Sequence, residues 1–123
     1  MDWKLELVPI PVSDVDRAKT FYTEQVGFNL DHDVAVSDKM RVVQLTPQGS
    51  ACSIVIGTGI VSTPPGSVQG LHLVVSDIEA ARAELAGRGV DVGEVLDLGG
   101  IMYVAFNDPD GNGWTLQQMP ARV

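Results

Sequence analysis

Two segments of the chain, Leu5–Val12 and Leu71–Val75, are mostly apolar and have strand-like composition. After each, apolar residues recur every three or four positions, the spacing of a helix with one buried stripe. The first stripe contains Val15, Ala18, Phe21, Tyr22 and Val26, and the second contains Ile78, Ala81, Leu85 and Ala86. Gly27 and Gly89 predict the helix ends, because glycine adopts the left-handed conformation there without a clash. The pattern predicts a strand followed by a helix, twice.

The two predicted strand-to-helix junctions repeat each other in sequence. Val-Ser-Asp-Val-Asp, beginning at Val12, returns as Val-Ser-Asp-Ile-Glu, beginning at Val75, 63 residues later. In each copy a serine precedes an acidic residue by three positions, which is the spacing of a helix capping box. The predicted capping pairs are Ser13 with Asp16 and Ser76 with Glu79. The chain is therefore an internal repeat.

Three short strand-like segments follow each predicted helix. They lie at about 28–36, 40–46 and 51–56 in the first half and at about 91–96, 101–107 and 113–119 in the second. Turn-forming residues separate the last two segments of each half, at Pro47–Ser50 and Asp108–Asn112. We expect a single α+β domain, 1–123, with module one at about 1–60 and module two at about 67–119. A half of this size is marginal alone, so the halves should fold together.

Charge and composition narrow the classes of partner. The chain of 123 residues has a formal net charge of −8 and no run of lysine or arginine, which argues against binding nucleic acid or an anionic membrane. No apolar stretch approaches the roughly 18 residues that span a bilayer. The single cysteine and two histidines exclude a disulfide within the chain and a multi-thiolate or His-rich metal cluster. We expect a cytoplasmic protein whose partner is a small organic molecule.

Two stretches of the sequence resemble signatures of a known superfamily. They are Val12–Ala18, leading to Phe21-Tyr22 and Val26–Phe28, and the run Phe106–Asn112 with its Asp-Pro-Asp-Gly-Asn turn. Together with the repeat they resemble the vicinal oxygen chelate superfamily, which includes glyoxalase I, bleomycin-resistance proteins, extradiol dioxygenases and methylmalonyl-CoA epimerase. The resemblance implies two tandem βαβββ modules that form a cup-shaped mixed sheet around a small-molecule cavity, with helices on the outer face, often in a homodimer. It leaves the reaction open, because function depends on the site and not on the fold.

The positions that hold metal ligands in metal-using relatives lack suitable side chains here. By the resemblance, the first ligand position falls on Leu7, the matching position in module two on Gly70 and the last on Thr115. Laying Gly49 on Gly111 brings Ser53 to the fourth. An apolar side chain, a glycine and two hydroxyls make a poor set for a divalent cation. We therefore expect no metal and no cofactor.

His72 has three possible roles. It shares a strand face with Gly70 and should point into the same cavity, and its counterpart in module one is Pro9, so no second imidazole faces it. It could pack in an apolar wall with one hydrogen bond, orient a ligand or act as a general acid or base, or bind a metal.

Strand alternation predicts the residues that line the cup. The predicted ligand-binding set is Leu7, Pro9, Ser53, His72, Thr115 and Gln117, with His72 also the candidate catalytic residue. This mostly apolar wall with a few polar groups suits a hydrophobic or aromatic compound.

Two further features favour structural roles. Asp108–Asn112 matches the start of a calcium-binding EF-hand loop, but the twelfth position holds Met119 where the loop needs a glutamate. We interpret it as a tight turn whose side chains bond their own backbone. Cys52 has apolar neighbours, so we expect a buried small residue and not a nucleophile.

Three functions remain open at this stage. The first is a metal-free protein that binds a small organic molecule, similar to bleomycin-resistance proteins. The second is a metal-independent isomerase, lyase or cyclase with His72 as the acid/base group. The third, a metal-dependent glyoxalase or dioxygenase, is disfavoured by the missing ligands. By the resemblance we also expect a homodimer.

Overall fold

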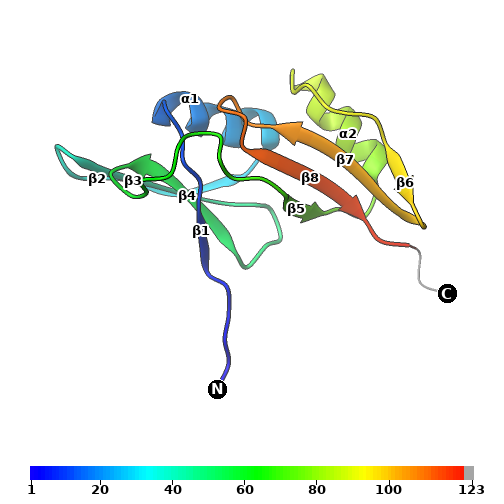
Figure 1. Ribbon diagram of the computed structural model, residues 1–123, viewed down its shortest axis with the longest axis horizontal. Helices are drawn as coiled ribbons and strands as arrows, with labels where there is room; N and C mark the ends of the chain where they lie inside the picture. Colours follow the sequence, from blue (N-terminus) through cyan, green and yellow to red (C-terminus); the bar gives the residue numbers. More distant parts are fainter. Residues whose placement is uncertain (121–123) are drawn as a thin grey trace.

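The computed structural model describes residues 1–120, which form two successive βαβββ modules (Figure 1). The first consists of β1 (Leu7–Pro9), α1 (Val15–Thr20), its π-helical continuation η1 (Phe21–Val26), β2 (Asn29–Ser37), β3 (Met40–Thr46) and β4 (Ser53–Thr58). The second consists of β5 (Leu71–Val74), α2 (Ile78–Gly87), β6 (Leu96–Leu98), β7 (Ile101–Asn107) and β8 (Gly113–Gln118). The predicted α+β fold with two βαβββ modules is confirmed.

Each module forms its own four-stranded sheet. The strand orders are β1-β4-β3-β2 and β5-β8-β7-β6, and the first strand of each module pairs in parallel with its last. The other pairs are antiparallel, so both sheets are mixed. The expected cup-shaped mixed sheet is thus divided into two. Both helices lie on the same side of the sheets, and the chain before β1 projects away from the other side (Figure 1).

The predicted strand at about 91–96 is only partly present: Val92 forms an isolated antiparallel bridge with Phe106 of β7, and Leu96 begins β6 (Leu96–Leu98). The residues before it form a loop held against α2. There the Arg82 side chain donates a hydrogen bond from Nε to the carbonyl oxygen of Gly93 at 2.7 Å. The predicted strands at 40–46 and 101–107 match β3 and β7 at both ends, and the other predicted strands are present with shifted ends.

The predicted capping boxes are also wrong. Asp14 and Asp77 are the N-caps, and each carboxylate accepts a hydrogen bond from the backbone N–H three residues later, at 3.1 and 3.0 Å. Aspartate is as good an N-cap as serine, and here it is the residue with extended backbone immediately before the first helical turn. The hydroxyl of Ser13 instead donates to Asp110 of the second module.

The predicted glycine at the end of the first helix is confirmed. Gly27 follows η1 with a φ of 91°, and its N–H donates to the carbonyl oxygen of Tyr22 at 3.1 Å. Gly89, with a φ of 85°, follows α2 in the same way. Both helices therefore end where a left-handed residue turns the chain toward the next segment.

A buried polar network joins the two modules. The Tyr22 hydroxyl donates to Asp108 Oδ2 at 2.8 Å and accepts from Trp114 Nε1 at 2.9 Å. The Asn112 side-chain amide donates to Asp108 Oδ2 and to the Pro11 carbonyl oxygen, both at 2.8 Å. Burial, together with the neighbouring Asp108 carboxylate, raises the pKa of Tyr22 far above its usual value. The hydroxyl therefore stays protonated and keeps donating.

The turn Asp108–Asn112 is structural, as predicted. Asp108 Oδ1 accepts hydrogen bonds from the backbone N–H groups of Asp110 and Asn112, both at 2.9 Å. β7 and β8 flank the turn, whereas helices flank an EF-hand loop.

Both modules contribute to one apolar core between the sheets and the helices. Its aromatic residues are Phe21, Tyr22, Phe28, Phe106 and Trp114. Tyr22 and Phe28 from module one contact Trp114 from module two, with ring centroids 5.8 and 5.6 Å from the indole. Cys52 is partly buried at the margin, where a buried position was predicted. Among residues 1–120, no helix is both long and apolar enough to cross a membrane.

Candidate functional site

The side of the sheets that faces away from the helices carries the predicted ligand-binding residues. Side chains alternate along a strand, and the residues next to the predicted ones, such as Val8, Ile54, Leu73 and Leu116, pack in or against the core. The predicted set points the other way, to a surface that we call the open side. It consists of Leu7, Pro9, Ser53, His72, Thr115 and Gln117.

These residues lie in two groups, one in each sheet. Leu7 on β1 lies opposite Ser53 on β4, and His72 on β5 lies opposite Thr115 on β8. The two sheets share no hydrogen-bonded pair of strands among the described residues. The structure thus brings each group together without joining the two groups.

The strand register revises one correspondence between the modules. Val55 lies opposite Pro9, just as Thr115 lies opposite His72. Val55, and not Ser53, is therefore the counterpart of Thr115. The reason is that the turn between β3 and β4 is longer than the turn between β7 and β8, which shifts an alignment based on the turn glycines.

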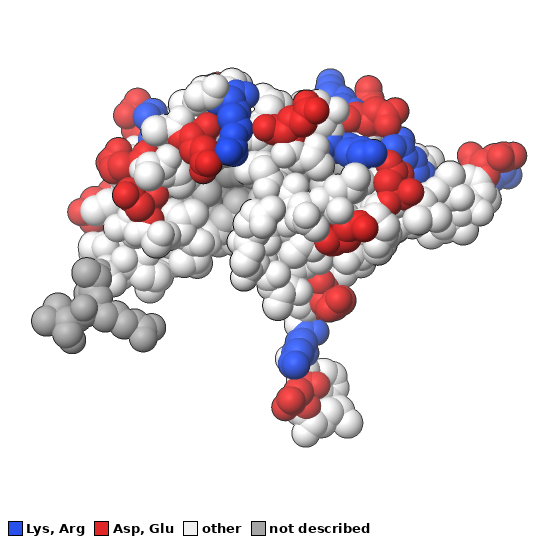
Figure 2. Space-filling model, turned by 180° about the vertical axis from the view of Figure 1, so that it is seen from behind, with Lys and Arg blue, Asp and Glu red and all other residues white. Residues whose placement is uncertain are grey.

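The open side is largely apolar and carries few charges. Val74, Leu96 and Leu98 each expose more than half of their surface to solvent. Arg41 is the one lysine or arginine within the described strands, and its guanidinium bonds Asp16 of the first helix at 2.9 Å, on the helix side. Charged side chains gather on the helix side of the molecule (Figure 2). Exposed apolar surface of this kind marks a binding or association surface.

A cluster of polar side chains interrupts the apolar surface of the first sheet. We call Asp31, Gln44, Thr46 and Ser53 the Asp31 cluster. The Thr46 hydroxyl bonds both Asp31 Oδ2 and Ser53 Oγ, the latter at 2.6 Å. The Gln44 amide lies 3.4 Å from Ser53 Oγ and 3.5 Å from Asp31 Oδ2. Hydrogen bonds, first that from Thr46, lower the pKa of Asp31, so its carboxylate is ionised at neutral pH.

His72 is exposed, and its ring is oriented by its own backbone. Nδ1 lies 2.7 Å from the carbonyl oxygen of Gly70. A carbonyl oxygen only accepts, so Nδ1 carries the proton and Nε2 of the neutral ring is an acceptor. The ring meets Tyr103 edge to face, with centroids 6.2 Å apart. Because Nε2 makes no hydrogen bond within residues 1–120, it is free to meet a ligand.

The side chains at the superfamily's metal-ligand positions do not fit a metal. Leu7, Gly70 and Val55, the last by the strand register, offer no donor atom, and Thr115 offers a neutral hydroxyl. The hydroxyl of Ser53, which the sequence placed at this position, is already bonded to Thr46. No group of three or more histidine, cysteine, aspartate or glutamate side chains within residues 1–120 is arranged to hold a metal ion. Divalent cations need carboxylate, imidazole or thiolate ligands.

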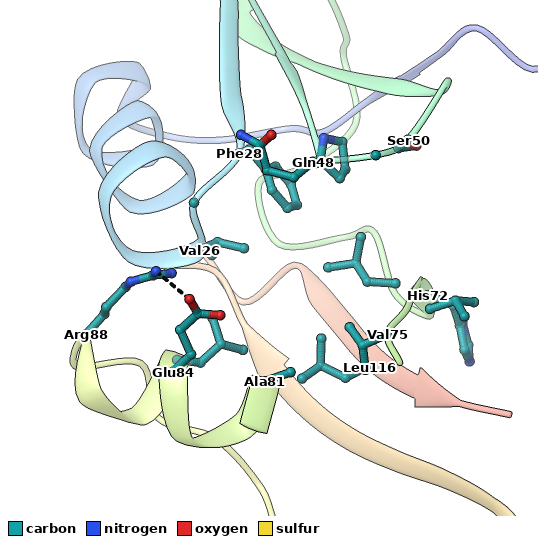
Figure 3. A pocket seen from close by; sticks show the side chains of 16 residues that line it. Val26, Phe28, Gln48, Ser50, His72, Val75, Ala81, Glu84, Arg88 and Leu116 are labelled. Atoms are coloured by element: carbon teal, nitrogen blue, oxygen red, sulfur yellow. Dashed lines mark hydrogen bonds and ion pairs between the residues drawn. The ribbon is translucent and has the colours of Figure 1, made fainter. Parts of the chain in front are cut away.

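A cavity of about 590 Å³ lies where the first module meets α2 and β5 (Figure 3). Its walls are mainly apolar and include Leu85, with Phe28 on one side and Leu116 on the other. Arg88 and Glu84 form an ion pair of 2.8 Å at its edge. His72 is the member of the predicted set that lines it, together with Val74, so this cavity adjoins the open side at β5.

Sequence reasoning missed the Asp31 cluster and the cavity. Alternation along β3 places Gln44 and Thr46 on the same face, and this signal was available. The face of the sheet on which Asp31 lies could not be predicted from alternation, because the pairing of β2 with β3 shifts register between Leu30 and His32. The cavity depends on the distance between a turn and a helix of different modules, which no local pattern encodes.

Comparison with known proteins agrees with the fold. TnmS3, an antibiotic-binding protein from Streptomyces sp. CB03234, is 38% identical, with a TM-score of 0.87 and 98% of each chain covered. A glyoxalase/bleomycin resistance/dioxygenase superfamily member from Sphaerobacter thermophilus DSM 20745 is 29% identical, with a TM-score of 0.84 over 95% of this chain and 98% of that one. The uncharacterized protein YetH of Bacillus subtilis (strain 168) is 29% identical over 115 residues, 90% of this chain and 94% of YetH.

The family profile of the Glyoxalase/Bleomycin resistance protein/Dioxygenase superfamily matches residues 4–116, which is nearly the whole chain. The match includes both modules, the repeated strand-to-helix junctions and the turn Asp108–Asn112. It confirms the resemblance inferred from those motifs. The chain belongs to the Glyoxalase/Bleomycin resistance protein/Dioxygenase superfamily.

Proposed function

We propose that this protein binds a hydrophobic or aromatic organic compound on the open side, without a metal. Leu7, Pro9, Ser53, His72, Thr115 and Gln117 would line the site. The observation that carries the proposal is an apolar surface, interrupted by a few polar side chains, on which Leu7, His72 and Val74 are exposed. Binding sites for small molecules have this composition.

The similarity to TnmS3 supports the same proposal. TnmS3 is an antibiotic-binding protein, and this chain is 38% identical to it over nearly its full length. Sequestering an antibiotic needs affinity and no chemical step, so a site with few titratable groups is adequate. The positions that hold metal ligands in metal-using relatives carry poor metal ligands in this chain, which is consistent with binding alone.

The proposal is tested by amide chemical shifts of the full chain titrated with 2-naphthalenemethanol, an uncharged aromatic probe. We expect saturable shifts at Leu7, Ser53, His72 and Thr115. Shifts confined to Leu85 and the residues around it would move the site to the cavity. The absence of any saturable shift up to about 1 mM, where binding free energy is only about 4 kcal/mol, would contradict the proposal.

We further propose that a second copy of the chain closes over the open side in a homodimer, with the compound enclosed between the two copies. The large exposed apolar side chains of the open side and of the arm before β1, among them Trp3 and Leu5, support this. A monomer that exposed them would be prone to association. Light scattering is expected to show twice the mass of 13.1 kDa, and a monomer at working concentration would contradict it.

A metal-independent isomerase, lyase or cyclase is the second candidate function. It is favoured by His72, whose Nδ1 is bonded to the Gly70 carbonyl oxygen and whose Nε2 is free to accept a proton. A bound compound that emerges chemically changed, and does so more slowly with His72→Ala, would support catalysis. Unchanged compound after long incubation would support binding alone.

A further inference from the structure

The Asp31 cluster and His72 both present acceptors to the open side. Resting on the proposed function, we infer that the site selects aromatic compounds that carry a hydrogen-bond donor, above all a protonated amine, and rejects carboxylates and phosphates. Asp31 and Gln44 are then specificity residues outside the predicted ligand-binding set.

The donor and acceptor of each hydrogen bond in the Asp31 cluster can be assigned by starting from the Asp31 carboxylate. The ionised carboxylate of Asp31 only accepts, so the Thr46 hydroxyl donates its one proton to it. Thr46 Oγ1 must therefore accept from Ser53, at 2.6 Å. Ser53 Oγ has then used its proton and accepts from Gln44 at 3.4 Å. Each donor of the chain points inward, toward Asp31.

What remains for a ligand is acceptor capacity. Asp31 Oδ1 accepts from Asn29 at 3.0 Å, and Oδ2 accepts from Thr46 and from Gln44, which leaves part of the carboxylate's capacity for one more donor. Both N–H groups of the Gln44 amide point to Ser53 and Asp31, so Oε1 is its free atom. The free atom of the neutral His72 ring, Nε2, is also an acceptor.

Within residues 1–120 no lysine or arginine side chain of the strands faces the open side. The basic groups near it are His32, which lies opposite Gln44, and Lys4 on the arm before β1. Arg41 is the one lysine or arginine that lies in a strand within residues 1–120. Its guanidinium forms ion pairs on the helix side with Asp33, at 2.8 Å, and with Asp16. Lys19 is held by Asp33 on that side as well, at 2.8 Å. An anionic ligand would lose its hydration without a cationic partner on the strands, whereas an amine would meet a carboxylate. The net charge of −8 adds to the same preference.

The test compares three probes with the same ring system: 2-naphthylmethylamine, 2-naphthalenemethanol and 2-naphthoate. Calorimetric titration of the full chain at neutral pH gives their affinities. We expect the amine to bind at least about tenfold more tightly than the carboxylate, with the alcohol between them. Equal or tighter binding of the carboxylate would overturn the inference.

Variants of Asp31 locate the preference. Asp31→Asn should lower the affinity for the amine by about fivefold or more and change the affinity for the alcohol by less than about twofold. Asp31→Lys should reverse the order of amine and carboxylate. The matched controls are Asp38→Asn and Asp38→Lys in the turn between β2 and β3, which alter net charge equally at an exposed residue without a side-chain hydrogen bond in the described part of the chain. Circular dichroism checks that each variant is folded.

The outcomes separate this inference from the proposed function. If the alcohol binds but the Asp31 and Asp38 variants lower the affinity for the amine equally, the preference for the amine comes from net charge and not from the Asp31 cluster. If all three probes bind alike, binding stands and selection fails. If none binds up to about 1 mM, the proposed function fails and this inference fails with it.

Discussion

The two repeats meet the turns of the other module in opposite ways. Beside α1, the turn Asp108–Asn112 is bonded to Tyr22 and Ser13 in a closed, polar junction. Beside α2, the corresponding turn Pro47–Ser50 leaves a cavity of about 590 Å³. We call these the closed and the open junction. The same backbone plan therefore produces one sealed contact and one gap.

A few side chains at equivalent positions account for the difference. Tyr22 of the first repeat corresponds to Leu85, 63 residues later. The hydroxyl of Tyr22 reaches Asp108, but leucine has no group that could bond the turn opposite it. Ala18 is completely buried, whereas its counterpart Ala81 lines the cavity. The repeat specifies the same elements twice, and side-chain chemistry decides which junction closes.

The largest effect should come from breaking the closed junction at Asn112. Asn112→Ala removes partners from the Pro11 carbonyl, the Val68 N–H and Asp108, all around a fully buried side chain. We expect a loss of about 3 kcal/mol in the free energy of unfolding, measured by denaturant titration. Ser50→Ala, in the turn of the open junction, should cost less than about 1 kcal/mol. Similar costs for both would erase the contrast between the junctions.

Enlarging the equivalent alanines should distinguish the junctions next. Ala18→Leu overfills a closed core position, and we expect a loss of about 2 kcal/mol. Ala81→Leu extends into the cavity, and the free energy of unfolding should stay within about 0.5 kcal/mol of the natural chain. A large loss at Ala81 would show that the cavity does not accept added volume.

Removing the Tyr22 hydroxyl should have a smaller effect. Tyr22→Phe leaves the ring in place but deprives Asp108 and Trp114 Nε1 of a partner, with an expected loss of about 1.5 kcal/mol. Tyr103→Phe, beside His72 on the open side, is the control and should be nearly neutral. Equal losses would mean that the hydroxyl contributes nothing particular to the closed junction.

The smallest predicted effect is a dependence on high pH. The folded-state pKa of Tyr22 is raised, so above the ordinary tyrosine value of about 10 the unfolded chain releases this proton while the folded chain keeps it. Stability contributed by the hydroxyl is complete below that value and falls as pH rises. At about pH 11 the advantage of the natural chain over Tyr22→Phe should shrink by about 1 kcal/mol. An advantage that stays constant from pH 8 would contradict the raised pKa.

Much of the fold was predictable because it follows from local patterns. Apolar spacing located both helices, and glycines located their ends. Errors arose where two local solutions were nearly equal, as at Asp14, which caps α1 in place of Ser13. They also arose where a distant side chain intervened, as when Arg82 holds the Gly93 loop that was predicted to be a strand.

The sequence by itself determined the repeat, the superfamily and the lack of suitable side chains at the superfamily's metal-ligand positions, because these depend on residue identity and spacing. Only the tertiary structure decided that Tyr22 seals one junction while Leu85 borders a cavity at the other. It also decided that Asp31 joins Thr46 and Ser53 on the open side. The physical reason is the same in both cases. Strand register and the docking of one module on the other set which side chains meet, and these long-range contacts have no period along the chain.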